Sequence, residues 1–376
     1  MKTILHSNPD FRALYSECGK ICVSIIVPTH KLSPERQSDK LVLSKAVDEA
    51  KKQLNNHFGV YHTDPVVDGL DELFNMVDFD HNEEGIGLFV SESRKLMVKF
   101  PFPVKERIIV SNRFEIRDLL VAERYNTPFL VLSLNEQEAR LYQGKMAIIR
   151  EIKDGFFPAK YIDDYEYNPP GKVNFFSGSS VVQQYEKDKS AQVAIHIKKF
   201  LQGVDEKLTP YLAVIPDMIL MAPKKELAWY SSITRHGDHL ISTVHGNFQH
   251  TSLHEVEAAC WTEMKQYLDL ENKHEFDEFR EKIGQKHAVF GLDEVWKSAR
   301  EGRALRLLVE KDFMMTAFTD EQGYELQVTP GAQSEKELPD AVDDLIRLVL
   351  DKNGGVCFTE NDQLKDYDRI ALITRY

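Results

Sequence analysis

The sequence predicts an α/β protein built from three domains. Its 376 residues correspond to two or three domains of ordinary size. Apolar residues make up 42% of the chain and aromatic residues 10%, which is typical of a globular protein with a sizeable core. Runs of helical period alternate with short apolar runs along the whole chain. This alternation predicts helices packed against the faces of sheets.

Residues 1–125 are predicted to form a mixed-sheet α/β domain. Its helices are expected over residues 8–17, 37–56 and 66–76. Its strands are expected over residues 23–27, 87–90, 96–98 and 107–110. The first strand stops at Pro28 and leads into a loop that carries Thr29, His30 and Lys31. The sequence Asn126–Pro128 breaks the pattern and ends the domain.

Residues 126–272 are predicted to form a second domain. Three short strands open it, and Gln143–Lys145 is expected to turn the second hairpin. A loop over 153–178, rich in aromatic residues, proline and glycine, leads into a long helix expected over 179–201. A loop of this length inside a compact domain is usually functional or disordered. Later strands are expected over 218–221 and 240–244, and later helices over 223–231 and 252–268.

Residues 273–376 are predicted to form the third domain, entered through a polar linker at Glu271–His274. Its helices are expected over 275–283, 291–301 and 338–352, the last one with Gly354 as its C-cap. Its strands are expected over 305–309, 324–328, 356–358 and 370–373.

The chain is acidic, with a net charge of −13. An acidic surface repels nucleic acid, so no DNA partner is expected and any RNA contact requires a local basic patch. Residues 275–376 hold 14 basic and 22 acidic groups, a net charge of −8, which favours this third for contact with a basic protein surface.

The sequence contains neither an evident signal peptide nor an apolar run of about 18 residues, so we expect a cytoplasmic protein without a membrane partner. The four cysteines, at positions 18, 22, 260 and 357, are expected to be free thiols in a reducing compartment.

Several short sequences carry a resemblance to a known family. In the last third they are Phe290–Val295, Glu301–Val309, Asn353–Val356 and Arg369–Tyr376. This order resembles the C-terminal domain of eukaryotic and archaeal class I release factors and Pelota, which implies an L7Ae-like fold. The middle third is similar as well, with three strands, a long loop, a helix and Met218–Pro223. Its implied fold is RNase H-like.

The first third adds Val27–Lys31 and a basic helix, which resemble the bacterial branch of the family. The resemblance covers nearly the whole chain and implies a ribosome-associated factor. It further implies ribosomal RNA as a partner and a translational GTPase as a possible partner of the acidic C-terminal domain. No cofactor is implied.

One departure from the family concerns the function directly. Release factors carry Gly-Gly-Gln on the middle-domain loop, where the glutamine positions a water molecule at the ester of peptidyl-tRNA. This chain has no Gly-Gly-Gln, and Gln183 and Gln184 fall on the predicted helix without flanking glycines. The resemblance therefore implies a rescue, occupancy or hibernation factor without catalytic residues, like the Pelota relatives that also lack the motif.

Candidate RNA-contacting residues follow from the resemblance and from side-chain type. Loop residues with phosphate-binding or base-stacking side chains are the candidates. They are Thr29, His30, Lys31, Arg36, Lys172, Asn174, Phe175 and Phe176. The basic helix after the first loop is equally explained as a solvated helix face, and the loop aromatics as side chains packed against their own domain.

Two alternative functions stay open. Five histidines fall between His236 and His254, which would suit a hydrolase or nuclease. His250 and His254 are spaced as two ligands on one helical face, but no Glu lies between them in the His-Glu-x-x-His manner. The sequence therefore predicts no metal site. The other alternative is a stress-related interaction module that does not bind ribosomes.

Overall fold

The computed structural model describes residues 9–19, 21–31, 34–58, 63–146, 148–162, 178–249, 251–320, 322–328 and 336–376. The chain divides into two compact units. Unit 1 combines Met1–Arg124 with Glu271–Tyr376, and unit 2 is Tyr125–Leu270. The separation of the first and last thirds into two domains stays a prediction. None of the described helices has the length and apolar character that a membrane span requires.

The first sheet of unit 1 has the strand order β3-β2-β1-β4. Its strands are β1 (Cys22–Pro28), β2 (Gly85–Ser91), β3 (Lys95–Phe100) and β4 (Arg107–Ser111). All three strand pairs are antiparallel, so the prediction of a mixed sheet in this part is wrong. Strand β1 runs antiparallel to both of its neighbours, β2 and β4. Strands β2 and β3 form an antiparallel hairpin, so no strand of this sheet has a parallel neighbour.

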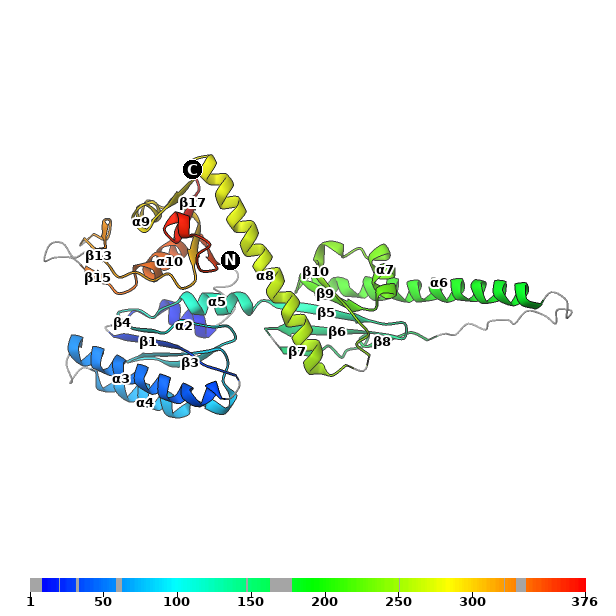
Figure 1. Ribbon diagram of the computed structural model, residues 1–376, viewed down its shortest axis with the longest axis horizontal. Coiled ribbons are helices and arrows are strands. Elements are labelled where there is room, and N and C mark those ends of the chain that lie inside the picture. Colours follow the sequence, from blue (N-terminus) through cyan, green and yellow to red (C-terminus); the bar gives the residue numbers. More distant parts are fainter. Residues whose placement is uncertain are drawn as a thin grey trace. The chain divides into compact units, whose positions relative to one another are not determined.

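Two long helices cover one face of this sheet, α3 (Asp39–Phe58) and α4 (Asp64–Met76) (Figure 1). Leu43, Val47 and Leu54 of α3 are separated by four and seven residues, so they share one helical face. This face packs on the alternate residues Val23, Ile25 and Val27 of β1. The apolar residues at helical spacing in α3 and those at alternate positions in β1 thus form one buried layer.

The other sheet of this unit has the order β11-β17-β12-β16 and contains one parallel pair, β12 with β16. Its strands are β11 (Ala288–Phe290), β12 (Ala304–Glu310), β16 (Gly355–Thr359) and β17 (Ile370–Thr374). Helices α9 (Leu292–Arg300) and α10 (Ala341–Asp351) pack on it. A small three-stranded sheet follows α9, with strands β13 (Ala317–Thr319), β14 (Leu326–Gln327) and β15 (Lys336–Leu338).

A shared core and buried charges join the two sequence segments of unit 1. Ile26 and Phe89 belong to the same apolar cluster as residues of α9 and α10. Arg117 begins α5 (Arg117–Tyr125), is fully buried, and donates a hydrogen bond to Asp340 at 2.6 Å. Asp343 accepts the Ile116 and Arg117 N–H groups, each at 3.0 Å. An acidic side chain at these amides favours the N-terminus of α5.

Unit 2 is built on one mixed sheet in the order β10-β9-β5-β6-β7, with β8 paired to β6. The strands are β5 (Pro128–Leu134), β6 (Glu138–Lys145), β7 (Ile148–Glu151), β8 (Ala159–Lys160), β9 (Met218–Ala222) and β10 (Leu240–His245). Strand β9 is parallel to both β5 and β10. Strand β6 is antiparallel to both β5 and β7.

Helices cover both faces of the unit 2 sheet. Leu130 and Leu132 of β5 pack with α6 (Gly178–Leu212) and α7 (Lys224–Ile233). The intervening Phe129 and Val131 pack with the first part of α8 (Leu253–Gly284). Because successive strand residues point to opposite faces, the continuous apolar run Phe129–Leu132 of β5 is explained by a sheet that is buried on both sides.

Three helices differ clearly from the sequence predictions. Helix α6 extends beyond residue 201 to Leu212, because Val204 and Leu208 continue its buried face. The expected linker Glu271–His274 lies inside α8, since its residues are polar but include no proline or glycine to end a helix. Helix α5 was not expected at all.

Two glycines have roles other than those predicted. Gly144 lies in β6 rather than in a turn, and a Cβ there would lie 2.4 Å from the ring of Phe129. The turn falls instead at Met146, which has a φ of 55°. After α10 the left-handed residue is Asn353, with a φ of 59°, while the Gly354 N–H bonds to the Val349 carbonyl at 2.8 Å.

Candidate nucleic-acid interface

The loop after β1 carries the predicted RNA-contacting residues of unit 1. Thr29 is buried, with 4% of its surface exposed. Its Oγ1 donates to the Glu83 carbonyl at 2.8 Å, and its N–H donates to the Glu84 carbonyl at 3.2 Å. Thr29 therefore fastens the loop to the chain before β2, and its hydroxyl is engaged within the protein.

His30 is held by a buried carboxylate. Asp39, the first residue of α3, accepts the His30 backbone N–H at 2.8 Å and lies 2.7 Å from His30 Nδ1. The amide of Asn82 donates to the same carboxylate at 2.7 Å. A carboxylate accepts hydrogen bonds, so it favours the proton on Nδ1 and leaves Nε2 for an external partner. The His30 side chain is 48% exposed, so such a partner can reach it.

The sequence did not single out Asp39 and Asn82, which position the loop. An aspartate at the start of a predicted helix was visible, and acidic residues are common there. Its bonds to His30 and Asn82 depend on chain segments that are 9 and 43 residues away, and these contacts follow from the fold.

The basic residues of the loop are paired with acceptors of the same unit. Lys31 Nζ lies 2.8 Å from the Glu83 carboxylate and 3.5 Å from that of Glu84. Partial burial lowers the pKa of Lys31, but hydrogen bonding and the charges of these two glutamates outweigh it and raise the pKa overall. Arg36, in the short 3-10 helix η1 (Glu35–Ser38), donates to the Asp80 carbonyl at 2.6 Å. A phosphate that binds Lys31 must therefore compete with Glu83.

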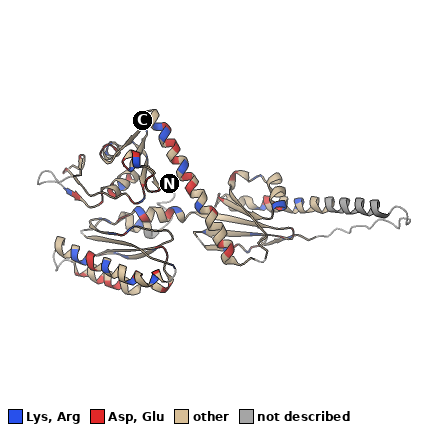
Figure 2. Cartoon of the chain, in the orientation of Figure 1, with Lys and Arg blue, Asp and Glu red and all other residues tan. Residues whose placement is uncertain are grey.

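Helix α3 also carries cations without an ion pair among the described residues. Lys40 and Lys45 are exposed, whereas Lys51 pairs with Asp71 at 2.6 Å and Lys52 with Glu49 at 3.7 Å. Figure 2 shows basic and acidic residues interleaved along α3. The exposed face of α3 therefore has mixed charge, and Lys40 and Lys45 are its lysines without an ion pair among the described residues.

The other candidate RNA contacts belong to the middle loop. Lys172, Asn174, Phe175 and Phe176 lie outside the residues that the structure describes. Of the aromatic residues earlier in the loop, Phe157 is 1% exposed and packs in the core of unit 2. At that position the packing alternative is correct.

Gln183 and Gln184 lie inside α6, as the sequence predicted. A residue inside a helix has helical backbone angles, and its backbone N–H group takes part in the helical hydrogen bonds. Neither glutamine is flanked by glycine, since Val181, Val182 and Tyr185 surround the pair. The pair therefore does not form the glycine-flanked turn on which a release factor carries its glutamine.

The histidine-rich segment of unit 2 is engaged in local hydrogen bonds. His236 Nε2 lies 3.1 Å from the Asp205 carbonyl, and His239 Nδ1 lies 2.7 Å from the Pro216 carbonyl. His254 is exposed, and His250 lies outside the described residues. Within the described ranges, no three side chains of histidine, cysteine, aspartate or glutamate are arranged to hold a metal ion.

The middle part of the chain is release-factor-like, because residues 128–303 match a family of that class. The family is described as bacterial archaeo-eukaryotic release factor family 3, and over these residues the predicted resemblance to the bacterial branch is confirmed. No curated protein sequence matches the chain.

Solved structures of related classes are similar at low identity. The archaeal translation termination factor aRF1 is 15% identical, covering 100% of this chain and 98% of its own, with a TM-score of 0.25. Pelota from Archaeoglobus fulgidus is 13% identical, covering 78% and 79%, with a TM-score of 0.37. Dom34 from S. cerevisiae is 12% identical, covering 78% and 80%, with a TM-score of 0.40. At such TM-scores these similarities assign no role to a residue of this chain.

Proposed function

We propose that this protein is a ribosome-associated factor of the release-factor and Pelota type that does not hydrolyse peptidyl-tRNA. The observation that carries the proposal is the combination of a release-factor family match over residues 128–303 with the absence of Gly-Gly-Gln from the whole sequence. The sheet order β7-β6-β5-β9-β10, antiparallel and then parallel, supports the RNase H-like fold expected for the middle part.

Peptide release requires a water molecule held in attack geometry at the ester, and positioning of this kind supplies much of the rate enhancement. Glycines beside the catalytic glutamine give the backbone conformations that other residues rarely adopt. Gln183 and Gln184 have helical geometry and valine neighbours instead. The protein would therefore occupy the ribosome without releasing the peptide.

The RNA-contacting surface of unit 1 consists of His30, Lys31 and Arg36, with Lys40 and Lys45 beside them on α3. Thr29 acts as an anchor beneath this surface because its hydroxyl is already bonded. The loop pairs Lys31 with two glutamates, so we expect each phosphate contact there to be weaker than that of an unpaired lysine.

The acidic last third is the proposed surface for a partner protein such as a translational GTPase. Its net charge of −8 overstates the acidic surface that a partner can meet. Glu310, Asp340 and Asp343 are buried, and the last two are bonded to groups within unit 1. We therefore expect salt to affect this association less than the sequence charge suggests.

Ribosome binding tests the proposed surface. The purified protein should co-sediment with vacant or stalled 70S ribosomes, and Lys31→Glu/Arg36→Glu should weaken the complex. Removal of each phosphate contact should also make the slope of log K against log salt less steep. The magnitude of this negative slope should decrease by about 0.9 for a contact to double-helical phosphates, and by somewhat less for a contact to a single strand.

A matched variant controls for the change in total charge. Lys297→Glu/Lys365→Glu makes the same change at two exposed lysines outside the loop and α3. Equal weakening in both double variants would mean that net charge, rather than the loop, sets the affinity. Unchanged affinity in Lys31→Glu/Arg36→Glu would remove those residues from the interface.

A further inference from the structure

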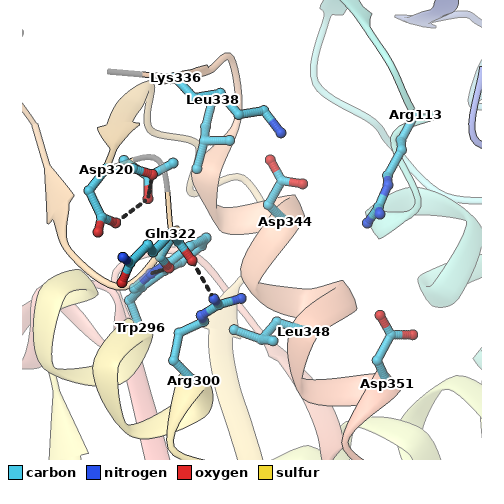
Figure 3. Close-up of a pocket in the computed structure, with 12 residues that line it drawn as sticks. Arg113, Trp296, Arg300, Asp320, Gln322, Lys336, Leu338, Asp344, Leu348 and Asp351 are labelled. Carbon is cyan, nitrogen blue, oxygen red and sulfur yellow. Dashed lines mark hydrogen bonds between the residues drawn. The ribbon is translucent and has the colours of Figure 1, made fainter. Parts of the chain in front are cut away.

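A polar cavity in unit 1 lies between α9, α10, the small sheet β14-β13-β15 and the loop before α5. Its volume is about 370 Å³, within the range typical of small-molecule sites. Figure 3 shows Arg113 and Lys336 reaching toward Asp344 from opposite sides, with Arg300 below them. Trp296, Leu338 and Leu348 supply apolar walls.

Most of the open hydrogen-bonding capacity in this cavity belongs to cationic donors. The side chains of Arg113 and Lys336 are exposed, and neither side chain makes a hydrogen bond or an ion pair with another described residue. The Arg300 guanidinium is held 4.8 Å from the Tyr324 ring centroid and donates from Nη2 to the Gln322 carbonyl at 2.7 Å. Its Nε has no partner among the described residues.

Two of the three carboxylates are already engaged. Asp320 Oδ1 accepts the Tyr324 N–H at 2.6 Å and the Glu325 N–H at 3.1 Å. Asp351 Oδ1 accepts the Tyr15 hydroxyl at 2.5 Å. The Asp344 carboxyl group makes no hydrogen bond to a described residue. The groups left for a ligand are therefore three cationic side chains, this carboxyl group and the side-chain amide of Gln322.

We infer that this cavity binds a small anion of the phosphate class, held by Arg113, Arg300 and Lys336, with the Asp344 carboxyl group as a further hydrogen-bonding partner. Guanidinium groups match the paired oxygens of phosphate, and an ammonium group adds a compact charge. The volume exceeds that of an inorganic ion, so the ligand carries its phosphate on a larger body. This inference does not depend on ribosome binding.

Asp344 makes binding depend on pH. Burial and the nearby Asp343 raise the pKa of its carboxyl group to about 6, against the opposing charges of Arg347, Arg113 and Lys336. Protonated, the carboxyl group donates a hydrogen bond to an anion; ionised, it repels the anion. The charged groups that line or adjoin this site are Arg113 and Glu115 before α5, Lys336 in β15, Arg300 in α9, Asp320 after β13, Asp340 before α10, and Asp343, Arg347 and Asp351 in α10.

Calorimetric titration of the full chain with pyrophosphate tests the site. We expect saturable binding of one ion, weakened about tenfold or more by Arg113→Ala and by Lys336→Ala, because each removes a charge-assisted contact. Lys365→Ala, at an exposed lysine outside the cavity, should bind as the unaltered chain does. Absence of saturation up to about 10 mM, or equal losses in all three variants, would overturn the inference.

Sulfate is the probe that isolates the role of Asp344, because the charge of the sulfate ion is constant between about pH 5.5 and pH 7.5. The unaltered chain should bind sulfate several-fold more tightly at the lower pH. Asp344→Asn should bind with similar affinity at both, because the amide donates a hydrogen bond at any pH. An equally large pH effect in this variant would exclude Asp344 from the site.

Competition distinguishes a small ligand from RNA. A nucleoside diphosphate should displace pyrophosphate, whereas a short RNA at the same phosphate concentration should not. RNA that binds more tightly than the diphosphate, and loses this binding in Arg113→Ala, would show that the cavity is part of an RNA interface and that the small-ligand proposal is wrong.

Discussion

Replacement of Arg117 by methionine should destabilise unit 1 strongly. The Arg117 side chain is fully buried, as is the side chain of Asp340, to which it bonds at 2.6 Å. It also donates to the Phe313 carbonyl. The variant removes both bonds and leaves a carboxyl group and a carbonyl without this partner.

The expected cost is about 3–5 kcal/mol, the usual range when one member of a buried ion pair is removed. Burial raises the pKa of Asp340, while Arg117 lowers it, so the variant also favours a protonated Asp340. Protonation limits the penalty, and the cost should therefore lie nearer the lower end at neutral pH. By comparison, Lys31→Met breaks a pair whose side chains are 44% and 41% exposed, and should cost less than about 1 kcal/mol.

Hydrogen exchange read by mass spectrometry can measure this cost within one unit. Amides of β12 and β17 report opening of unit 1, and amides of β5 and β9 report opening of unit 2 as an internal reference. Arg117→Met/Asp340→Asn should recover part of the loss, because asparagine removes the unpaired acid and keeps an oxygen for the Val342 N–H at the start of α10. A single-variant cost below about 1 kcal/mol would refute the reasoning.

Three further predictions concern buried groups and metal. Burial raises the pKa of Glu115 well above 4.5, so the folded state retains a proton that the unfolded state releases, and stability falls as pH rises above that value. Glu115→Gln should remove this fall and raise the free energy of unfolding near pH 8, measured by urea unfolding. Gly144→Ala should cost about 1–3 kcal/mol in the same assay, because its Cβ would meet the Phe129 ring, and less when combined with Phe129→Leu. Elemental analysis should find no stoichiometric zinc; one tightly held ion per chain, lost on His250→Ala, would favour the hydrolase alternative.

The sequence predicted most helices and strands because local patterns determine them. The apolar face of α3 and the continuous apolar run of β5 were both visible as periodicity. The same patterns do not show whether a polar stretch is a linker or an exposed part of a helix. Polar residues at 271–274 indicated a linker, yet they form part of α8 because helix-forming polar residues continue a helix as readily as they interrupt an apolar face.

Contacts between distant segments could not be predicted from the sequence for a different reason. Charged residues are read as exposed unless a partner is known. Arg117 and Asp340 are buried together although 223 residues separate them, and neither segment shows a local sign of this pairing. For the same reason the candidate loop showed His30 and Lys31 but not the acids that hold them, Asp39 and Glu83.

The central claim is that the protein binds ribosomes and leaves the nascent peptide attached. The most direct test is sedimentation of the protein with 70S ribosomes that carry labelled peptidyl-tRNA at a stop codon, with the peptide followed in the same fractions. We expect the protein to migrate with the ribosomes while the label stays on tRNA, and puromycin to release it afterwards. Stop-codon-dependent release of the label by this protein, abolished by Gln183→Ala or Gln184→Ala, would contradict the account, as would a protein that stays at the top of the gradient at low salt.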